Sequence, residues 1–567
     1  MNEELEAFLG HIKGAAAYDV GVGVVVREFV QRMQFVETLN ELLPWDPKQC
    51  AVSPGQRILA LVIAFIEDRK ALYRIEEAYA HRDVELLLGQ GVAAEQLNDK
   101  ALGRALDKLW TADPKRVYST LCFRAVEAYE VVIDRLHTDT TSVSVEGVYA
   151  GPTEGGPQIT FGFSKDHRPD LRQIKLGTTV TQEGIPLAGD VFDGNETDQT
   201  WNQALLDWLE DWISPEKRQE TLFAADSALI TSDNLKHLDQ GGYRFVSRLP
   251  DTFSYATVAR SEALYGPAEK WEDIGKLAHE KKASEYQLRE VAGEIEERDY
   301  RLIVVRSSRL FELKQKTLER KATKEREALE RAGRKIGRET FSCREDAETA
   351  LQTLLDQLAP RFWTAEHYVE DAVIQPPRRR GRPAKTDEPP AGATVYRVHL
   401  APAALDRDAF ERECRWQSTF VLISNDSSRT AMELFIAYRG QAAAESEFRW
   451  LKSPVHISPV FLKRPTRVAA FGYVMLMAYL VYALVQRAIR NALPEGELLA
   501  VEGRKTDHPT AQAVFDVIAH AKVLHVKFPG QALARIFLTP SAKAARILEL
   551  LRIPADAFIT VPGLNSA

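Results

Sequence analysis

The chain has 567 residues, of which 45% are hydrophobic and 27% charged, a composition typical of a soluble protein with roughly two to four domains. Its four cysteines, Cys50, Cys122, Cys343 and Cys414, are widely spaced and form no CxxC pair, which argues against a disulfide framework or a structural zinc site. The net charge of −8 excludes a uniformly basic nucleic-acid-binding protein but leaves room for local basic patches.

Residues 1–125 are predicted to be helical, because apolar residues recur at helical spacing over 58–65 and 101–109. Ser53 and Pro54 are a typical helix start, with serine as the N-cap and proline in the first turn. The first residues, MNEELEAFLG, have neither the basic nor the apolar segment of a signal peptide, which indicates a cytoplasmic protein.

Residues 126–250 change to apolar runs and period-two alternation, which are typical of β-strands. The expected elements are strands near 136–145, 176–180, 185–192, 221–225 and 243–249, and an amphipathic helix at 201–213. Several strands in succession, followed by a helix and further strands, predict a mixed α/β core.

Residues 251–400 are expected to be an insertion in this core. Residues 300–305 predict a strand, and the highly charged stretch 311–338 predicts a solvated helix or a short helical hairpin, since its heptad pattern is too poor for a coiled coil. Residues 376–390 are rich in Pro, Arg and Gly and are predicted to form a flexible linker.

The core is expected to resume over 401–490, with a buried strand at 419–425 and a long helix at 428–452. Residues 468–485 carry no charge, and this length is close to that of a membrane span. A helix buried on all sides within a large domain has the same composition, and we favour that interpretation over a membrane-anchored helical protein. Residues 491–567 are predicted to be helical.

Two aspartates stand out in the strand region. Asp139 lies between an apolar run and an alternating strand, and Asp226 follows a second apolar run directly. Aspartate is disfavoured inside strands and costly to bury unpaired, which indicates a specific role for such residues. For Asp226, a role as the cap of a turn or helix is an equally open alternative.

The helix expected at 428–452 carries a polar face. At about 100° per residue, five side chains share this face: Tyr438, Gln441, Glu445, Arg449 and Lys452. Glu447 falls on the opposite side. A face of this kind can simply be solvated, but this helix directly follows a buried strand, so we expect one of its faces to point toward the sheet.

This helix resembles the Y-x2-R-x3-E-x6-K signature of the DDE transposases of bacterial insertion sequences, which have a ribonuclease-H-like core. Tyr438, Glu445 and Lys452 match the signature, whereas Gln441 stands where the family usually has arginine. The segments HTDTT around Asp139 and ADS around Asp226, together with Gly194-Asn195-x-x-Asp198, resemble further family motifs in the right order. The resemblance covers most of residues 20–490, and the helical start is similar to the insertion sequence sixteen-thirty-four-like subgroup.

The resemblance implies that Asp139, Asp226 and Glu445 bind two Mg²⁺ ions, with Mn²⁺ as a possible substitute, and that the enzyme cleaves DNA at the ends of its element and transfers the strands into target DNA. It also implies that the polar face of the helix contacts DNA, with Tyr438 and Lys452 holding the terminal phosphate. The uncharged Gln441 weakens one such contact and with it the case for a hairpin intermediate. A homodimer on paired terminal inverted repeats is expected, with no role for a membrane.

Outside the core, four arginines in the linker, Arg378, Arg379, Arg380 and Arg382, resemble an AT-hook that enters a narrow minor groove. A solvated basic linker that contacts phosphates without preference is an equal alternative. Lys463, Arg464 and Arg467 could follow the DNA backbone, and the N-terminal helices are the expected readers of the element ends.

The sequence thus predicts an α/β catalytic core, ribonuclease-H-like with a mixed sheet, interrupted by an insertion and flanked by all-α N-terminal and C-terminal regions. The expected divisions are 1–125, 126–250, 251–400, 401–490 and 491–567. The predicted function is that of an active DNA transposase. The alternatives are a catalytically inactive relative that binds DNA, a simple metal-dependent nuclease and a membrane-anchored protein.

Overall fold

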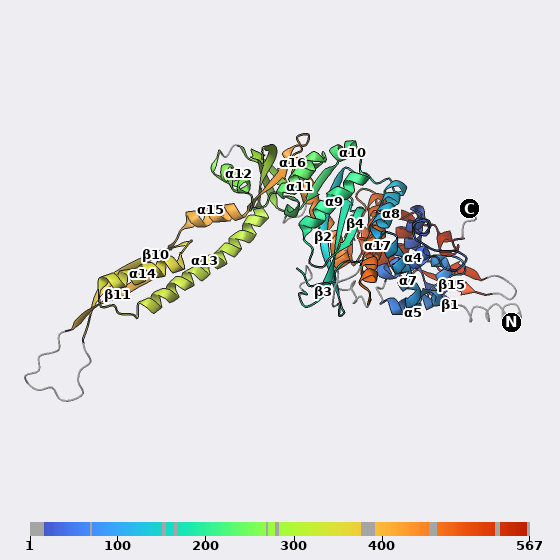
Figure 1. The fold of residues 1–567 in the computed structure, drawn as a ribbon, viewed down its shortest axis with the longest axis horizontal. Coiled ribbons are helices and arrows are strands. Elements are labelled where there is room, and N and C mark those ends of the chain that lie inside the picture. The colour runs from blue at the N-terminus through green and yellow to red at the C-terminus, as the bar shows by residue number, and fades with distance from the viewer. Residues whose placement is uncertain are drawn as a thin grey trace, which may run out of the picture. The chain divides into compact units, whose positions relative to one another are not determined.

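The computed structural model describes residues 16–67, 71–149, 155–163, 168–267, 270–277, 283–375, 392–452, 462–527 and 533–563, without the side chains of residues 441–449 and 452. The chain forms two compact units (Figure 1). Unit 1 comprises Met1–Ser247 and Leu434–Ala567, and unit 2 comprises Arg248–Glu433.

Unit 1 contains a mixed β-sheet, as predicted. Its strands follow the order β4-β3-β2-β5-β6. Their bounds are β2 (Arg135–Val145), β3 (Arg172–Thr181), β4 (Pro186–Phe192), β5 (Leu222–Ala225) and β6 (Arg244–Arg248). The first three strands are antiparallel to one another, whereas β5 is parallel to both β2 and β6. All five strands were expected from the sequence within a few residues.

Helices cover the two faces of this sheet. On one face lies α9 (Asp198–Trp212), whose Trp201 donates a hydrogen bond from Nε1 to Thr138 Oγ1 (2.9 Å). On the other face lie α8 (Pro114–Ala128) and α17 (Pro465–Ala492), because a Cβ atom at Gly189 would be 2.7 Å from Tyr118 and 3.0 Å from Leu476. Gly189 pairs with Thr178, and Thr178 with Asp139. Directly paired residues share a face, so Asp139 lies on the side of α8 and α17.

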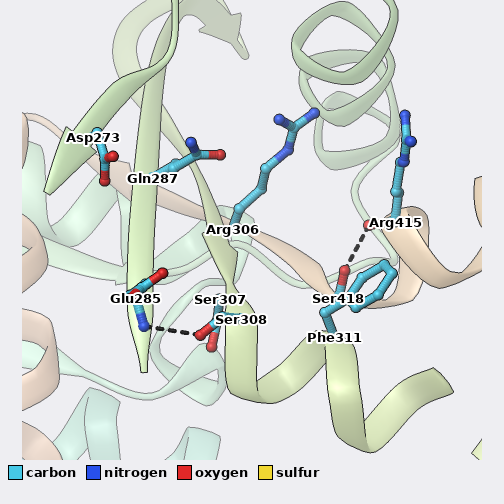
Figure 2. A pocket seen from close by; sticks show the side chains of 9 residues that line it. All are labelled: Asp273, Glu285, Gln287, Arg306, Ser307, Ser308, Phe311, Arg415 and Ser418. Atoms are coloured by element: carbon cyan, nitrogen blue, oxygen red, sulfur yellow. Dashed lines mark hydrogen bonds between the residues drawn. The ribbon is translucent and has the colours of Figure 1, made fainter. Parts of the chain in front are cut away.

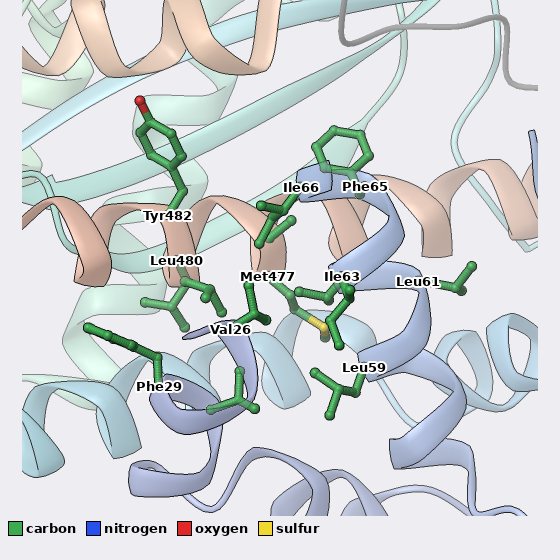
Figure 3. Close-up of a cluster of buried hydrophobic side chains, with 14 of the residues drawn as sticks. Val26, Phe29, Leu59, Leu61, Ile63, Phe65, Ile66, Met477, Leu480 and Tyr482 are labelled. Carbon is green, nitrogen blue, oxygen red and sulfur yellow. The ribbon is translucent and has the colours of Figure 1, made fainter. Parts of the chain in front are cut away.

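The core of unit 1 is built around α17. Apolar side chains of α2 (Gly21–Arg32) and α4 (Pro54–Glu67) pack against Met477, Leu480 and Tyr482 of this helix (Figure 3). By length and composition α17 could cross a membrane, but 94% of its most apolar window is buried inside the protein. The expectation of a core helix is therefore confirmed for 468–485.

The predicted start of α4 is also confirmed. Ser53 Oγ accepts a hydrogen bond from Gln56 N (3.1 Å), and Gln56 Oε1 accepts one from Ser53 N (2.8 Å), which together form a capping box. The remaining helices of unit 1 are α3 (Phe35–Leu42), α5 (Ile75–Ala80), α6 (Val84–Leu88), α7 (Asp99–Thr111), α10 (Pro215–Glu220), α11 (Ser232–Gln240), α18 (Ala511–Ile518) and α19 (Ala542–Leu550).

The terminal regions are not all-α, contrary to expectation. Near the N-terminus, β1 (Ala16–Asp19) pairs with β15 (Lys522–Val526), which in turn pairs with β16 (Ala534–Phe537). A second small sheet joins β13 (Leu499–Val501) to β14 (Arg504–Thr506). Such strands are too short to show a clear period of two, and β1 finds its partner at the opposite end of the chain, so local pattern reading missed them.

Unit 2 begins with an antiparallel sheet. Its strands follow the order β12-β9-β8-β7, with bounds Thr419–Ser424, Arg298–Ser307, Glu285–Ile295 and Glu272–Lys276. Two helices accompany this sheet, α12 (Ser254–Tyr265) and α15 (Arg407–Gln417). The strands expected at 300–305 and 419–425 are therefore confirmed as β9 and β12.

The rest of unit 2 is an arm made of α13 (Ser308–Ile336), α14 (Arg344–Leu358) and the hairpin of β10 (Trp363–Ile374) with β11 (Ala393–Leu405) (Figure 1). α13 is one continuous helix of 29 residues, which decides between the single helix and the helical hairpin expected for 311–338. Its buried Leu329 and Ile336 pack with Val398 and Leu400 of β11.

A buried ionic cluster fixes the turn from β12 into α16 (Ala431–Lys452). Asp426 is fully buried and accepts hydrogen bonds from Ser428 N (2.8 Å) and Ser428 Oγ (2.6 Å), while Arg429 pairs with its other oxygen. Burial acts to raise the pKa of the Asp426 carboxyl, but the donors of Ser428 and Arg429 outweigh it and lower this pKa to about 2. Thr430 and Glu433 then form a capping box at the start of the helix.

Further along, α16 lies against β2. A Cβ atom at Gly440 would be 3.0 Å from Cε1 and 3.1 Å from Nε2 of His137, whose side chain is buried. A side chain at Gly440 would press on this ring, which would have to shift by a few tenths of an ångström. The contact places the backbone of α16 beside a residue two positions before Asp139.

The Asp426 cluster predicts a pH-dependent contribution to stability. Because the folded pKa of about 2 lies below the unfolded value of roughly 3.9, the ionised carboxylate stabilises the fold fully above pH ~4, and this contribution is lost as the pH falls toward 2. We expect Asp426→Asn to lower the free energy of unfolding by about 1–2 kcal/mol at neutral pH. Urea unfolding between pH 3 and 7 should show this difference shrinking toward the acid end.

Asp406→Asn is the matched control, because Asp406 is an exposed N-cap of α15 and asparagine caps helices equally well. The assignment would be contradicted if Asp426→Asn lowered the free energy of unfolding equally at every pH. It would also be contradicted if that loss were no larger than the loss caused by Asp406→Asn.

The Gly440 contact predicts that an alanine at this position stabilises the protein only when the His137 ring is absent. Glycine to alanine inside a helix normally stabilises by about 0.5–1 kcal/mol. Here we expect Gly440→Ala to bring no gain in the wild type, because the new methyl group meets the His137 ring, and to bring the ordinary gain in a His137→Ala background. A double-mutant cycle in urea measures the difference, and additive effects would show that the two residues do not touch.

Candidate active site

The pairing of β2 with β5 brings the two candidate aspartates together. The two strands are parallel, and His137 pairs with Ala224. Asp139 and Asp226 each lie two residues further along, and the backbone of Asp226 is extended, so the two aspartates are in register on neighbouring strands. In-register residues share a face and are separated by about one strand spacing, ~4.8 Å. Both carboxylates therefore lie on the face that α16 approaches.

Backbone donors orient both carboxylates. Asp139 Oδ1 accepts a hydrogen bond from Thr140 N (2.7 Å), and Asp226 Oδ1 accepts one from Ala228 N (2.9 Å). Asp226 thus caps the turn at Ser227–Leu229, which was the alternative role expected for it. Ser247 Oγ of the next strand donates to the carbonyl oxygen of Asp226 (2.7 Å). Both aspartates are half-buried, and capping does not take Asp226 out of register with Asp139.

The third candidate, Glu445, lies on α16. This helix spans the whole signature region, as predicted. Glu445 follows Gly440 by five residues, which is about 7.5 Å along a helix. Tyr438 is half-buried, whereas the side chains of Gln441, Glu445, Arg449 and Lys452 lie outside the described residues. The structure therefore brings Asp139, Asp226 and the backbone of α16 to one face of the sheet.

His137 is a residue of this site that the sequence did not single out. Burial, with a smaller effect from Arg135, lowers its pKa to about 4, so the ring is neutral at neutral pH. In the structure, its ring packs against the backbone of α16 at Gly440. The sequence feature that could have identified it is its position two residues before Asp139, because side chains two apart lie on the same face of a strand.

A second polar group supports the same strand from the other side. Thr140 Oγ1 donates to Asp198 Oδ1 (2.6 Å), and Lys175 Nζ of β3 contacts the same oxygen (3.0 Å). Asp198 is the first residue of α9, so this cluster ties the helix start to β2 and β3. It gives Asp198, the last residue of the Gly194-Asn195-x-x-Asp198 motif, a structural contact next to Asp139.

Outside α16, the sequence predicted DNA contacts after the catalytic helix and in the linker. Arg467 is bound to Asp107 by two hydrogen bonds (2.7 and 2.6 Å), and Arg464 lies 3.8 Å from the same carboxylate. Arg467 therefore joins α17 to α7, and its charge is already paired within the protein. The linker arginines Arg378, Arg379, Arg380 and Arg382 lie outside the described residues.

The donor set fits a divalent cation. Within the described residues, no group of three or more His, Cys, Asp or Glu side chains could hold a metal ion. Asp139 and Asp226 supply carboxylate oxygens, the ligands that Mg²⁺ prefers, from neighbouring strands. Two like charges this close repel each other, and a cation between them would offset that repulsion.

Unit 2 contains a separate polar pocket of about 360 Å³ (Figure 2). The side chains of Arg306 and Arg415 extend in the same direction along it, and the Arg306 guanidinium lies 3.7 Å from the centre of the Trp271 ring. Asp273 and Glu285 also line this pocket, so positive and negative groups are mixed there. It contains none of the three candidate carboxylates.

Comparison with known proteins found one family that covers most of the chain. The family described as "Transposase DDE domain" matches residues 136–481, and a domain of unknown function, DUF4277, matches residues 19–123. No curated protein matches the chain. Among solved structures, the cryo-EM structure of a piggyBac transposase synaptic complex with hairpin DNA is a distant likeness, with a TM-score of 0.36, 8% identity and coverage of 88% of this chain and 79% of that one.

The first family match spans more than half of the chain and includes Asp139, Asp226 and Glu445. The protein belongs to the transposase DDE domain family.

Proposed function

We propose that this protein is an active DNA transposase of a bacterial insertion sequence, which cleaves DNA at the ends of its element and joins the freed strands to target DNA. The observation that carries the proposal is the register of Asp139 and Asp226 on the parallel strands β2 and β5. Two carboxylates on one face, next to the helix that contains Glu445, are the arrangement that phosphodiester chemistry with divalent cations requires.

In this proposal Asp139, Asp226 and Glu445 hold two divalent cations, Mg²⁺ or Mn²⁺. Such cations, when bound, activate the attacking oxygen and stabilise the leaving oxygen of a phosphodiester. The protein keeps the ligands rigid: backbone donors orient both aspartates, and the neighbouring Asp198–Lys175–Thr140 cluster holds β2 from its other face.

The strand order supports assigning the sheet of unit 1 to a ribonuclease-H-like core. Three antiparallel strands are followed by two strands parallel to the first, and both aspartates lie at the central pair. Unit 2 is then the insertion, because it lies between β6 and the main part of α16 along the chain. The subgroup similar to insertion sequence sixteen-thirty-four remains the proposed branch.

For DNA, we propose that Tyr438, Gln441, Arg449 and Lys452 contact the strand that reacts. Gln441 is uncharged, which favours direct transfer by a 3′ hydroxyl over a route through a hairpin. Residues 1–125 are proposed to recognise the terminal inverted repeats, and the linker arginines to add minor-groove or phosphate contacts. The proposed assembly is a cytoplasmic homodimer on paired ends.

Excision of a marker flanked by the native element ends tests this function. We expect Asp139→Asn, Asp226→Asn and Glu445→Gln each to abolish excision, because each removes a charged ligand with almost no change in shape. Glu447→Gln is the matched control, since Glu447 lies on the opposite side of the same helix and should leave excision intact.

The three variants should still fold and bind end DNA, as measured by thermal unfolding and mobility shift. Retained excision in Glu445→Gln would show that the third ligand is misassigned. A wild-type protein that binds its ends but never excises would favour the inactive DNA-binding relative, and cleavage without joining would favour a simple nuclease.

A further inference from the structure

The long helix of the arm has a charge opposite to that of the whole chain. α13 contains ten Lys or Arg residues and five Glu residues, a local charge of +5 in a protein of net charge −8. Three of its larger apolar residues, Leu318, Leu329 and Ile336, are buried in the arm, whereas Leu313 near the start of the helix is exposed. What the helix exposes is therefore mainly charge.

The positive charges of α13 are gathered on one side. Taking the buried Leu318 as zero, at about 100° per residue, six basic residues fall between roughly 160° and 260°, opposite the buried side. We call this set the basic stripe: Lys316, Arg320, Lys324, Arg331, Arg334 and Lys335. All six side chains are exposed. Only Glu327 interrupts the stripe, while Glu312, Glu319 and Glu330 fall near 100–120°, along its border.

The basic stripe is not neutralised by its own arm. Among the residues that the structure describes, no carboxylate forms an ion pair with any of the six. Two of the five acids of α13 have other partners: Glu325 accepts from the backbone N–H groups of Arg361, Phe362 and Trp363, and Glu330 pairs with Arg326. The stripe thus presents a net positive charge, six basic residues against the one Glu327, over about 29 Å of helix.

These properties select one kind of partner. A second copy of the same stripe would be repelled, and an apolar partner would find only the single exposed Leu313 on this side of the helix. A DNA duplex carries one negative charge per ~1.7 Å, and one turn of it is about 34 Å long, close to the length of the stripe. In addition, the chain segment with Arg378, Arg379, Arg380 and Arg382 connects β10 to β11, the hairpin against which α13 packs.

We propose that the basic stripe of α13 binds the phosphate backbone of duplex DNA without sequence preference, so that the arm of unit 2 is a DNA-holding element separate from the carboxylate site. This inference rests on the proposed function for the identity of the nucleic acid. Contacts to phosphates alone give affinity and position but not sequence recognition.

The test is a salt titration of DNA binding by the full-length protein. The probe is a fluorescein-labelled duplex of mixed sequence, about four helical turns long. In the variant R320Q/K324Q/R331Q/K335Q, glutamine preserves helix propensity while four charges are removed. Each lost phosphate contact reduces the slope of log K against log salt by about 0.9, so we expect a slope reduced by roughly 3–4 and binding weaker by about 10-fold or more.

The control variant, R504Q/K505Q/K527Q/K543Q, removes four exposed charges from unit 1 and should bind with the wild-type slope. Thermal unfolding checks that both variants are folded. An unchanged slope in the stripe variant, or an equal loss in the control, would overturn the inference and leave the proposed function standing. A wild-type protein that binds the native element ends but not this duplex would overturn the inference alone, and one that binds neither would overturn both.

Discussion

The parallel pairing of β2 with β5 is the constraint on which the candidate site depends. It sets Asp139 and Asp226 in register, and backbone donors and the Ser247 hydroxyl hold them there. Parallel neighbours require a crossover connection, which here contains β3, β4, α9 and α10. The helices that pack on both faces of the sheet therefore help to keep β2 and β5 paired, although their two carboxylates repel each other.

The residues that surround Asp139 and Asp226 are constrained by close packing and by hydrogen bonds. A side chain at Gly440 would press on the ring of His137, and His137 stays neutral because it is buried. On the opposite face, Asp198 links α9 to β2 and β3 through Thr140 and Lys175. None of these residues is a proposed metal ligand, but their contacts hold β2 and α16 in place around the two aspartates.

Much of the core could be predicted from the sequence, because β2 to β6, α9, α16 and α17 are long or strongly patterned. The buried apolar helix α17 was distinguished from a membrane span by its context and proved to be 94% buried. The short strands β1 and β13 to β16 could not be predicted, since their partners lie in distant or equally short segments. Similarly, Arg467 looked available for DNA until its pairing with Asp107 was visible, because a sequence does not show which charges are already neutralised.

The placement of α17 has a consequence for protein synthesis. The N-terminal helices α2 and α4 bury their apolar faces against a helix that leaves the ribosome only after all of unit 2 has been made. A nascent chain that ends within unit 2 contains both aspartates but lacks α17 and α16, so it has neither the core of unit 1 nor the third carboxylate. Unit 1 can therefore complete its core, and bring α16 beside β2, only after most of the chain has been synthesised.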